Sequence, residues 1–428
     1  MRMKRTVKKL WVILLGLGLL FGAAWVTVSS MRATRPPAPP SGSPIGYSWG
    51  SIHLDASHVE PDSDLERTIK ASFESEPEGS FDPDKDGQRE YSILVLSGGG
   101  SSGAYGAGFL TGWSKAGTRP NFKIVTGVST GSLQSTFAYL GPEYDDELTE
   151  VFTLYSTDEI YTKRSLLGAA LGESAWDTAP LKELIDRYIT SDVLAAVAAK
   201  HATGHRLFIG TANMDTDEFI IWDMGAIATS DRPDKLERYR NVLLASSSIP
   251  VLFPPVYFEV EIDGQDYYEM HVDGGIQAQL FLRGFMLDCE ETFDEDLRTR
   301  DADVSLYLIR NGTASESITR EVTEPSTVSI ASATINQLVD LSAASSLFRV
   351  YVLAARNDVD FNLAAIPDDE FPDLDSIKFD IAKMRELYDF AYNQASSGYD
   401  WAKVPPRLDP TETIPPLPGR NPEDAGAR

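Results

Sequence analysis

Two short apolar runs, each leading through glycines into a helical segment, constrain the fold of this chain most strongly. Residues 91–96 (YSILVL) suit a strand buried on both faces, and glycines separate them from a helical segment at 103–116. Residues 122–128 repeat the pattern before a helix predicted over 131–140. Strands that alternate with helices indicate an α/β fold, with three layers (α/β/α) around a mainly parallel central sheet.

The alternation continues toward the C-terminus. Further strands are predicted over 207–211, 219–222, 267–272 and 304–309, and further helices over 179–189, 235–245, 328–353 and 377–393. We therefore expect a folded core over residues 91–310 and a C-terminal helical part of the same domain over residues 311–402.

The segments on either side of this core differ from it in composition. Residues 29–90 form a predicted Pro-rich and acidic linker: RPPAPPSGSP at 35–44 indicates a semi-rigid spacer. Residues 55–90, rich in Asp, Glu, Ser and Pro, predict an extended, mostly solvated segment that sets the distance from a membrane. Seven prolines over residues 405–428 predict a loose tail over 403–428.

The N-terminus carries an anchoring or export signal. A basic head at residues 1–9 holds five Lys or Arg and precedes 19 uncharged, mostly apolar residues at 10–28. That length just spans a bilayer core of about 30 Å, and the positive-inside rule sends the rest of the chain outward. We expect a single transmembrane anchor with an extracytoplasmic body, periplasmic in a bacterium with an outer membrane. The alternative is a signal peptide cleaved within residues 1–30 and a secreted body.

The charge restricts the partners that this chain binds. The net charge is −26, and residues 36–428 alone hold 31 basic against 64 acidic residues, or −33. Such a body repels phosphate backbones, so no nucleic-acid partner is expected. Cys289 is the single cysteine, which excludes an internal disulfide and a zinc site of paired cysteines. No metal or cofactor is expected, and the sequence leaves the oligomeric state open.

The glycine-rich loop at 97–103 (SGGGSSG) has two interpretations. It fits the G-x-G-x-x-G pattern of dinucleotide-binding proteins, but these need an acidic residue roughly 20 positions on, and residues 104–142 hold none. A nucleotide-binding enzyme is therefore the weaker alternative. The other interpretation is an oxyanion hole, because open backbone amides can converge on a developing negative charge. Its donors would come from Gly98, Gly99, Gly100, Ser101, Ser102 and Gly103.

The pattern G-x-S-x-G of a nucleophile elbow occurs twice, around Ser101 and around Ser129. An elbow needs a strand directly before the serine and a helix directly after it. Ser129, between Gly127 and Gly131, meets this condition, whereas Ser101 lies inside the glycine turn. We therefore predict Ser129 as the nucleophile.

A serine nucleophile needs a base. His201 and His205 lie in a polar connection, where surface histidines are common. His271 lies two residues before Asp273, so both side chains share one face of a predicted strand. Two glycines follow Asp273 and let other backbone approach closely, which suits a catalytic carboxylate.

These residues together resemble the patatin-like phospholipase family. Four blocks occur in the family's order: SGGGSSGAYGAG (97–108), GVSTG (127–131), ASSSIPVLFPPV (245–256) and DGG (273–275). The resemblance implies a patatin-like fold and a Ser129–Asp273 dyad without a catalytic histidine, which leaves His271 a structural or tuning role. It also implies hydrolysis of the acyl esters of lipids.

One position departs from the family pattern. Ser102 stands where the family usually has Arg or Lys, so a positive charge near the oxyanion or a lipid phosphate is missing. This departure weakens the expectation for phospholipids more than the expectation for ester hydrolysis. A non-catalytic, membrane-tethered protein that kept the fold is the leading alternative function.

Overall fold

The computed structural model describes residues 34–43, 49–53, 64–81, 89–282, 286, 302–313, 322–368, 370–371, 375–406 and 408. The predicted head and apolar run at residues 1–28 lie outside the described residues, as do Cys289 and most of the predicted tail.

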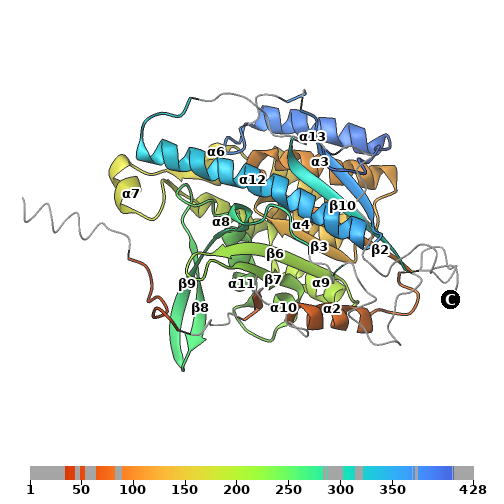
Figure 1. Cartoon of the computed structure of the whole chain (residues 1–428), viewed down its shortest axis with the longest axis horizontal. Coiled ribbons are helices and arrows are strands. Elements are labelled where there is room, and N and C mark those ends of the chain that lie inside the picture. Colours follow the sequence, from red (N-terminus) through yellow and green to blue (C-terminus); the bar gives the residue numbers. More distant parts are fainter. Residues whose placement is uncertain are drawn as a thin grey trace, which may run out of the picture.

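A nine-stranded sheet runs through the described part of the chain (Figure 1). The strands are β1 (Ser51–His53), β2 (Arg89–Leu96), β3 (Ile124–Val128), β6 (Arg206–Asn213), β7 (Phe219–Asp223), β8 (Val256–Ile262), β9 (Gln265–Asp273), β10 (Ala302–Thr313) and β11 (Asp360–Ile366). The order β6-β3-β2-β10-β11 is parallel, and β7, β1, β9 and β8 join antiparallel. The sheet is thus mixed and mostly parallel at its centre, in agreement with the predicted α/β class.

Helices cover both faces of the sheet. The core on one face includes residues of α3 (Gly103–Ala116), α4 (Thr130–Leu140), α5 (Asp145–Thr153), α6 (Thr157–Ile160), α8 (Ala179–Tyr188), α9 (Ser191–His201), α10 (Met224–Thr229), α11 (Lys235–Ser246) and α13 (Ile381–Ser396). The core on the other face includes residues of α2 (Asp64–Glu74) and α12 (Thr327–Arg356). Two short strands, β4 (Thr162–Lys163) and β5 (Trp176–Asp177), flank α7 (Leu166–Leu171).

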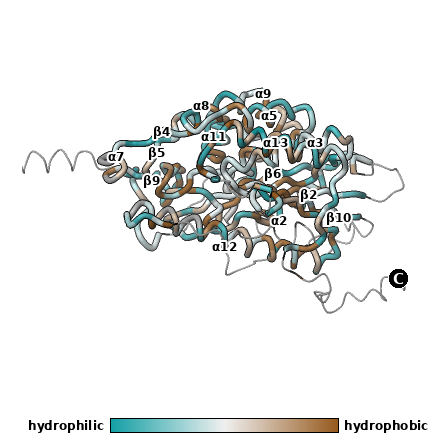
Figure 2. The backbone as a smooth tube through the Cα atoms, turned by 90° about the horizontal axis from the view of Figure 1, so that it is seen from above, coloured by the Kyte–Doolittle hydropathy of each residue, from teal (hydrophilic) through white to brown (hydrophobic). Residues whose placement is uncertain are grey.

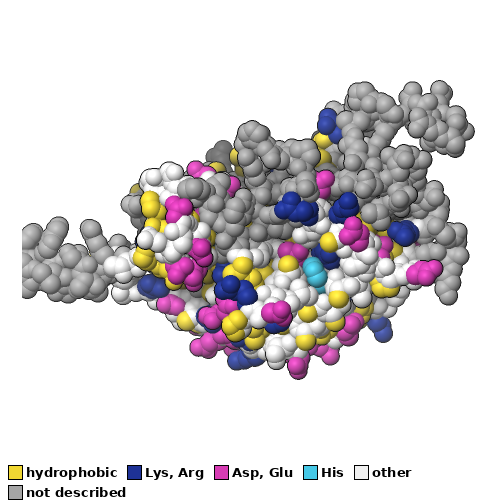
Figure 3. All heavy atoms as spheres, turned by 90° about the horizontal axis from the view of Figure 1, so that it is seen from below, with side chains coloured by type: hydrophobic (Ala, Val, Ile, Leu, Met, Phe, Trp, Pro, Cys, Tyr) yellow, Lys and Arg dark blue, Asp and Glu magenta, His cyan; other side chains and the backbone are white. Residues whose placement is uncertain are grey.

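The central strands are apolar throughout because both of their faces are buried. Leu94 and Leu96 of β2 point into the core on the first face, whereas Ile93 and Val95 point into the core on the second. Figure 2 shows hydrophobic residues gathered in these inner strands and hydrophilic residues on the outside. Acidic side chains are spread over the face seen in Figure 3, among basic and hydrophobic ones, rather than gathered in one patch.

The prediction of an extended, solvated linker over residues 55–90 is wrong for residues 64–74. These residues form α2, and Leu65, Ile69 and Phe73 are buried against the sheet. Their spacing of four residues places all three on one face of a helix, a signal that the acidic composition of the segment obscured.

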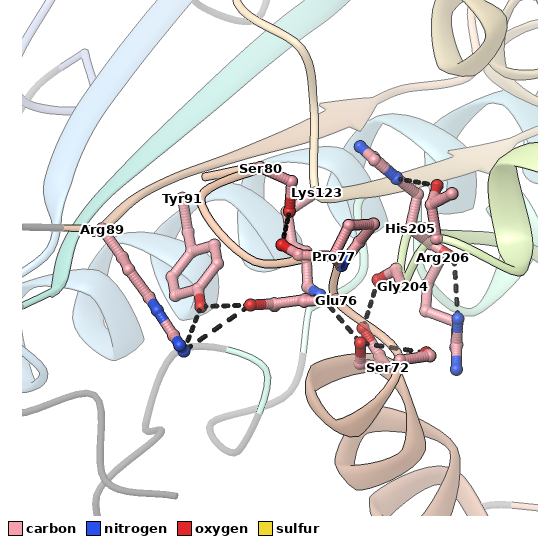
Figure 4. Close-up of polar contacts among 12 residues, drawn as sticks. Ser72, Glu76, Pro77, Ser80, Arg89, Tyr91, Lys123, Gly204, His205 and Arg206 are labelled. Atoms are coloured by element: carbon pink, nitrogen blue, oxygen red, sulfur yellow. Dashed lines mark hydrogen bonds and ion pairs between the residues drawn. The ribbon is translucent and has the colours of Figure 1, made fainter. Parts of the chain in front are cut away.

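Lys123, just before β3, ties the segment after α2 to the sheet (Figure 4). Its ammonium is fully buried, pairs with Glu76 and donates to the Ser72 carbonyl at 3.1 Å. The rings of Phe73 and Phe81 lie with their centres 4.5 and 4.7 Å from the same nitrogen. A buried charge needs such partners, so this contact makes residues 64–81 part of the folded body.

Two other predictions need correction in the C-terminal part. It is not only helical, because β11 adds a strand parallel to β10 at the edge of the sheet. The helix predicted over 377–393 begins at Ile381 and ends at Ser396. Asp380 caps it, since its carboxylate accepts hydrogen bonds from the amides of Ala382 and Lys383.

Within α12, residues Gln337–Arg356 form a stretch whose length and composition would allow it to cross a bilayer, and core helices of soluble proteins also meet this test. Here Leu347 and Val350 pack on the sheet, whereas Leu341 and Phe348 are exposed on the opposite face of the helix.

Candidate active site

Strand order brings Ser129 and Asp273 together. β3 pairs with one edge of β6 as far as Val128, which lies opposite Gly210. β9 pairs with the same edge from the next residue onward, because β7 occupies the other edge of β6, and Asp273 lies opposite Thr211. β3 and β9 therefore meet end to end at the carboxyl edge of the parallel strands, where α/β proteins bind ligands.

Ser129 sits in a sharp strand-to-helix turn. Its backbone has φ 55° and ψ −129°, a conformation that non-glycine residues rarely adopt. The turn needs both flanking glycines. A Cβ on Gly131 would lie 2.4 Å from the Leu96 carbonyl oxygen, and one on Gly127 would lie 2.5 Å from the Gly131 carbonyl oxygen. The hydroxyl is thus presented at the tip of a strained turn, as an elbow requires.

The Asp273 carboxyl is buried beside this hydroxyl. It accepts a hydrogen bond from the Ser129 side chain and another, at 2.7 Å, from the amide of Gly275. Burial raises the pKa of Asp273 to about 7, although both hydrogen bonds act to lower it. A carboxylate desolvated in this way is a much stronger base than a solvated aspartate.

The Ser-rich block at 245–256 holds both residues in place. The Ser246 hydroxyl accepts a hydrogen bond from the Ser129 amide at 2.9 Å and donates to the Gly210 carbonyl at 2.8 Å. Two residues later, the Ser248 carbonyl accepts a hydrogen bond from the Asp273 amide at 2.9 Å. The last residue of α11 and the turn just after it therefore fix the backbone of both members of the candidate dyad.

The glycine loop lies against the same turn. A Cβ on Gly98 would come within 2.9 Å of the Ser129 Cβ, and Gly100 lines the same cavity as Ser129. Among the described residues, the amides of Gly98, Gly99 and Gly100 donate to no hydrogen-bond acceptor. These three amides therefore remain available to a ligand.

The second half of the loop is already engaged. The amide of Ser101 donates to the Ser376 carbonyl at 2.8 Å, and the amide of Ser102 donates to the Gly99 carbonyl at 3.0 Å. The predicted donor set is thus reduced from six residues to the first three glycines. The same contacts occupy two amides that a pyrophosphate would use, so the loop geometry offers little to a dinucleotide.

A buried pair of amide side chains holds the loop in shape. The side-chain amide of Asn311 donates to the Ser97 carbonyl at 2.8 Å and to the Gln134 side chain at 2.9 Å, and its oxygen accepts from the Gly106 amide at 3.0 Å. Gln134 in turn donates to the Gly103 carbonyl at 2.6 Å. Both residues are buried, so this network fixes the loop relative to α3 and α4.

An apolar cavity that is partly open to solvent begins at Ser129. Leu133 and Phe137 line it one and two turns along α4, so it extends about 12 Å from the hydroxyl at the rise of an α-helix. The rest of the wall comes mainly from apolar side chains of α5, α8, α11 and α13 and from residues 376–379. The shape and lining suit a single hydrocarbon chain.

The histidines lie away from this arrangement. His271 bonds the Thr211 hydroxyl at 3.0 Å through Nδ1, and its ring packs edge-on against Phe258. His205 is buried rather than on the surface as expected, and burial lowers its pKa to about 3. The described residues contain no group of three or more His, Cys, Asp or Glu side chains that could hold a metal ion.

Comparison with known proteins identifies the domain. Residues 94–286 match the family model of the patatin-like phospholipases. The chain contains a patatin-like phospholipase domain. This family assignment supports lipid acyl hydrolase activity in general and implies a lipid substrate.

Other comparisons add one distant structure. The crystal structure of VipD from Legionella pneumophila aligns with 74% of this chain and 69% of VipD, at 13% sequence identity and a TM-score of 0.32. No curated protein matches the chain.

Several residues that shape the site of the patatin-like domain were missed by sequence reasoning. Asn311 and Gln134 carry no local motif, because they meet only through tertiary packing. Ser246 and Ser248 lie in the block that carried the family resemblance, but only the structure shows what they hold. A buried amide or hydroxyl in an otherwise apolar segment is the one signal that could have pointed to them.

Proposed function

We propose that the patatin-like domain is a serine hydrolase that cleaves acyl ester bonds of lipids. Ser129 is the nucleophile, Asp273 is the general base, and the amides of Gly98, Gly99 and Gly100 form the oxyanion hole. The observation that carries the proposal is the buried Asp273 carboxyl, which accepts the Ser129 hydroxyl at the mouth of an apolar cavity.

The mechanism follows from these positions. Asp273 takes the proton of Ser129 as the serine oxygen attacks the ester carbonyl, and the open loop amides stabilise the tetrahedral oxyanion. Protonated Asp273 then returns the proton to the leaving alcohol, which leaves an acyl-enzyme. Water, deprotonated by the same carboxylate, attacks the acyl-enzyme, and Asp273 returns the proton to the Ser129 oxygen as the bond to the acyl group breaks and the fatty acid leaves. The steps need no group other than these residues and water.

The cavity supports a substrate with one long apolar acyl chain. A chain placed with its carbonyl at Ser129 would run along Leu133 and Phe137 and bury apolar surface over its whole length. The loop supplies no Arg or Lys at Ser102, so recognition rests on the acyl chain more than on a phosphate. We infer that the enzyme favours long-chain esters and discriminates weakly between head groups.

Labelling with a fluorophosphonate probe tests the catalytic assignment. The wild-type chain should be labelled, whereas Ser129→Ala should not be. Ser101→Ala is the matched control: it removes the other G-x-S-x-G serine, whose hydroxyl donates to the Asp375 carbonyl, and should keep the label. A wild-type chain that resists the probe would instead support a non-catalytic binding protein.

A chain-length series tests the substrate class. Hydrolysis of p-nitrophenyl laurate should exceed that of the butyrate, and Leu133→Trp should reverse the order, because the larger ring fills the cavity one turn from Ser129. Equal losses for both esters would show that the cavity does not hold the acyl chain.

We further propose that residues 10–28 anchor the chain in a membrane, with the body on the extracytoplasmic side. The support is the basic head and the 19-residue apolar run of the sequence. Mass measurement of the mature chain distinguishes this from a cleaved signal peptide.

A further inference from the structure

Residues 34–40, part of the predicted spacer, are held to the body through Arg35 and Pro37. The guanidinium of Arg35 makes two hydrogen bonds of 2.8 Å to the two carboxylate oxygens of Asp215, and a third of 2.9 Å to the Tyr268 carbonyl. The Pro37 carbonyl accepts a hydrogen bond of 2.8 Å from the Tyr268 amide. We call residues 34–40 the docked segment. Bidentate pairing of this kind fixes orientation as well as position.

The docked segment lies at the same edge of the sheet as the candidate active site. Asp215 follows the carboxyl end of β6. Its carboxylate also accepts a hydrogen bond from the amide of Met270, which lies three residues before Asp273 on β9. In Figure 1, residues 34–43 run beside the β8–β9 hairpin, at the end of the molecule that carries α7; Figure 2 places α7 and β9 at that end as well.

The contacts continue from Arg35 to the wall of the cavity. The guanidinium carbon lies 5.7 Å from the centre of the Tyr257 ring, and the Tyr257 hydroxyl donates to Glu173 at 2.5 Å. Three residues further on, the ring of Trp176 packs 5.8 Å from the ring of Phe253, which lines the cavity. The docked segment is thus linked to the cavity wall by the contacts of Arg35, Tyr257 and Glu173 and by the backbone between Glu173 and Trp176.

The length of chain before Arg35 restricts where the body can be. Six residues (29–34) separate Val28, the last of the apolar run, from Arg35, which makes seven residue-to-residue steps. Fully extended, they span at most about 25 Å. A folded body of this size has a radius of gyration of about 20 Å, so its far side lies beyond the reach of this tether, and the side that carries Arg35 has to face the bilayer.

We propose that the docked segment holds one side of the body, formed by Arg35–Asp215, the base of the β8–β9 hairpin and α7, against a bilayer of zwitterionic lipids. This proposal rests on the proposed lipid hydrolase function and on the anchor at residues 10–28. Met214 and Val251, exposed by 47% and 37%, are apolar side chains on this side that would meet the lipid. Zwitterionic lipid is specified because an anionic surface repels a body of charge −33.

An environment-sensitive probe tests the orientation without using enzymatic activity. The full chain, with Cys289→Ser, carries NBD either at Met214→Cys or at Thr118→Cys, and is reconstituted into phosphatidylcholine vesicles. Thr118 is exposed and follows α3 at the opposite edge of the sheet, so it is the far-side control. NBD at 214 should shift to the blue and be quenched by doxyl-labelled lipid, whereas NBD at 118 should not.

Variants of Arg35 test whether the specific hydrogen bonds of the docked segment, rather than its positive charge alone, orient the body. Arg35→Gln should remove most of the quenching at 214, and Arg35→Lys should remove part of it, because lysine cannot reproduce the bidentate pair. Arg32→Gln removes the same charge from the same tether and should leave the quenching unchanged.

Four results would overturn the orientation: equal quenching at 214 and 118, equal effects of Arg32→Gln and Arg35→Gln, quenching only on anionic vesicles, or a mature chain that lacks residues 1–30. If the orientation holds but the fluorophosphonate probe does not label Ser129, the proposed hydrolase fails and the docking surface stands.

Discussion

Replacing Asp273 with asparagine should inactivate the enzyme and at the same time stabilise its fold at alkaline pH. The asparagine keeps an oxygen that accepts the amide of Gly275 and the hydroxyl of Ser129, so the local hydrogen bonds survive. It removes the only feature of this position that opposes folding, which is a negative charge buried away from water.

The magnitude follows from the pKa of Asp273. The carboxyl has an ordinary pKa of 3.8 and a pKa of about 7 in the folded chain, where burial is the main cause of the rise. Between these two values the folded chain binds the proton more tightly than the unfolded chain, so the free energy of unfolding falls as the pH rises from about 4 to 7. At 1.36 kcal/mol per pH unit, the buried charge costs the wild type about 4 kcal/mol above pH 7.

Urea unfolding followed by tryptophan fluorescence measures this difference. Asp273→Asn should be more stable than the wild type by up to about 4 kcal/mol at pH 8.5 and about equal to it at pH 3, where Asp273 is largely protonated in both the folded and the unfolded chain. Ser129→Ala is the control, because it is also expected to be inactive but keeps the buried carboxyl. A stability difference between Asp273→Asn and the wild type that did not change with pH would refute a desolvated base.

Three other predictions follow from the same site and its scaffold. The rate of ester hydrolysis should rise with pH and level off above pH 7. At pH 5 only about 1% of a carboxyl with a pKa near 7 is ionised, so the rate should be about a hundredfold below the plateau. An unchanged rate at pH 5 would contradict Asp273 as the base. Gly100→Ala should lower kcat by about a hundredfold or more in a steady-state assay, because Gly100 has φ 55° and a Cβ there would lie 1.8 Å from the Ser376 carbonyl oxygen; full activity would show that the loop amides are not needed. Lys123→Met should lower the free energy of unfolding by about 3–5 kcal/mol in the urea assay, because Glu76 loses its buried partner, and a change below 1 kcal/mol would mean that the pair is solvated.

The α/β class and the elements around the elbow could be predicted because their signals are local. The helix expected at 103–116 has the bounds of α3, and the strand expected at 122–128 contains β3, since glycines end one element and begin the next. Ser129 could be chosen over Ser101 on the same ground, because an elbow depends on the residues directly beside it.

Features that depend on contacts between distant segments could not be predicted. The burial that raises the pKa of Asp273 arises where β9 meets the end of β3, and strand order does not follow from residue spacing. The helix α2 and the docked segment have acidic or proline-rich compositions typical of linkers. The apolar face of α2 packs on the sheet, and each segment is also held by a charged contact, Lys123–Glu76 or Arg35–Asp215, whose partners lie 47 and 180 residues apart in the sequence.

The two hydrogen bonds made by Ser246 and Ser248 connect the fit of the substrate to the geometry of the dyad. Ser246 holds the backbone of Ser129 and Ser248 holds the backbone of Asp273, while Ser247, between them, lines the cavity. An acyl chain that fills the cavity contacts Ser247, which lies between the two residues that hold the nucleophile and the base. A poorly fitting chain should therefore lower kcat as well as raise KM, so that the enzyme selects its substrate during the chemical step and not only on binding.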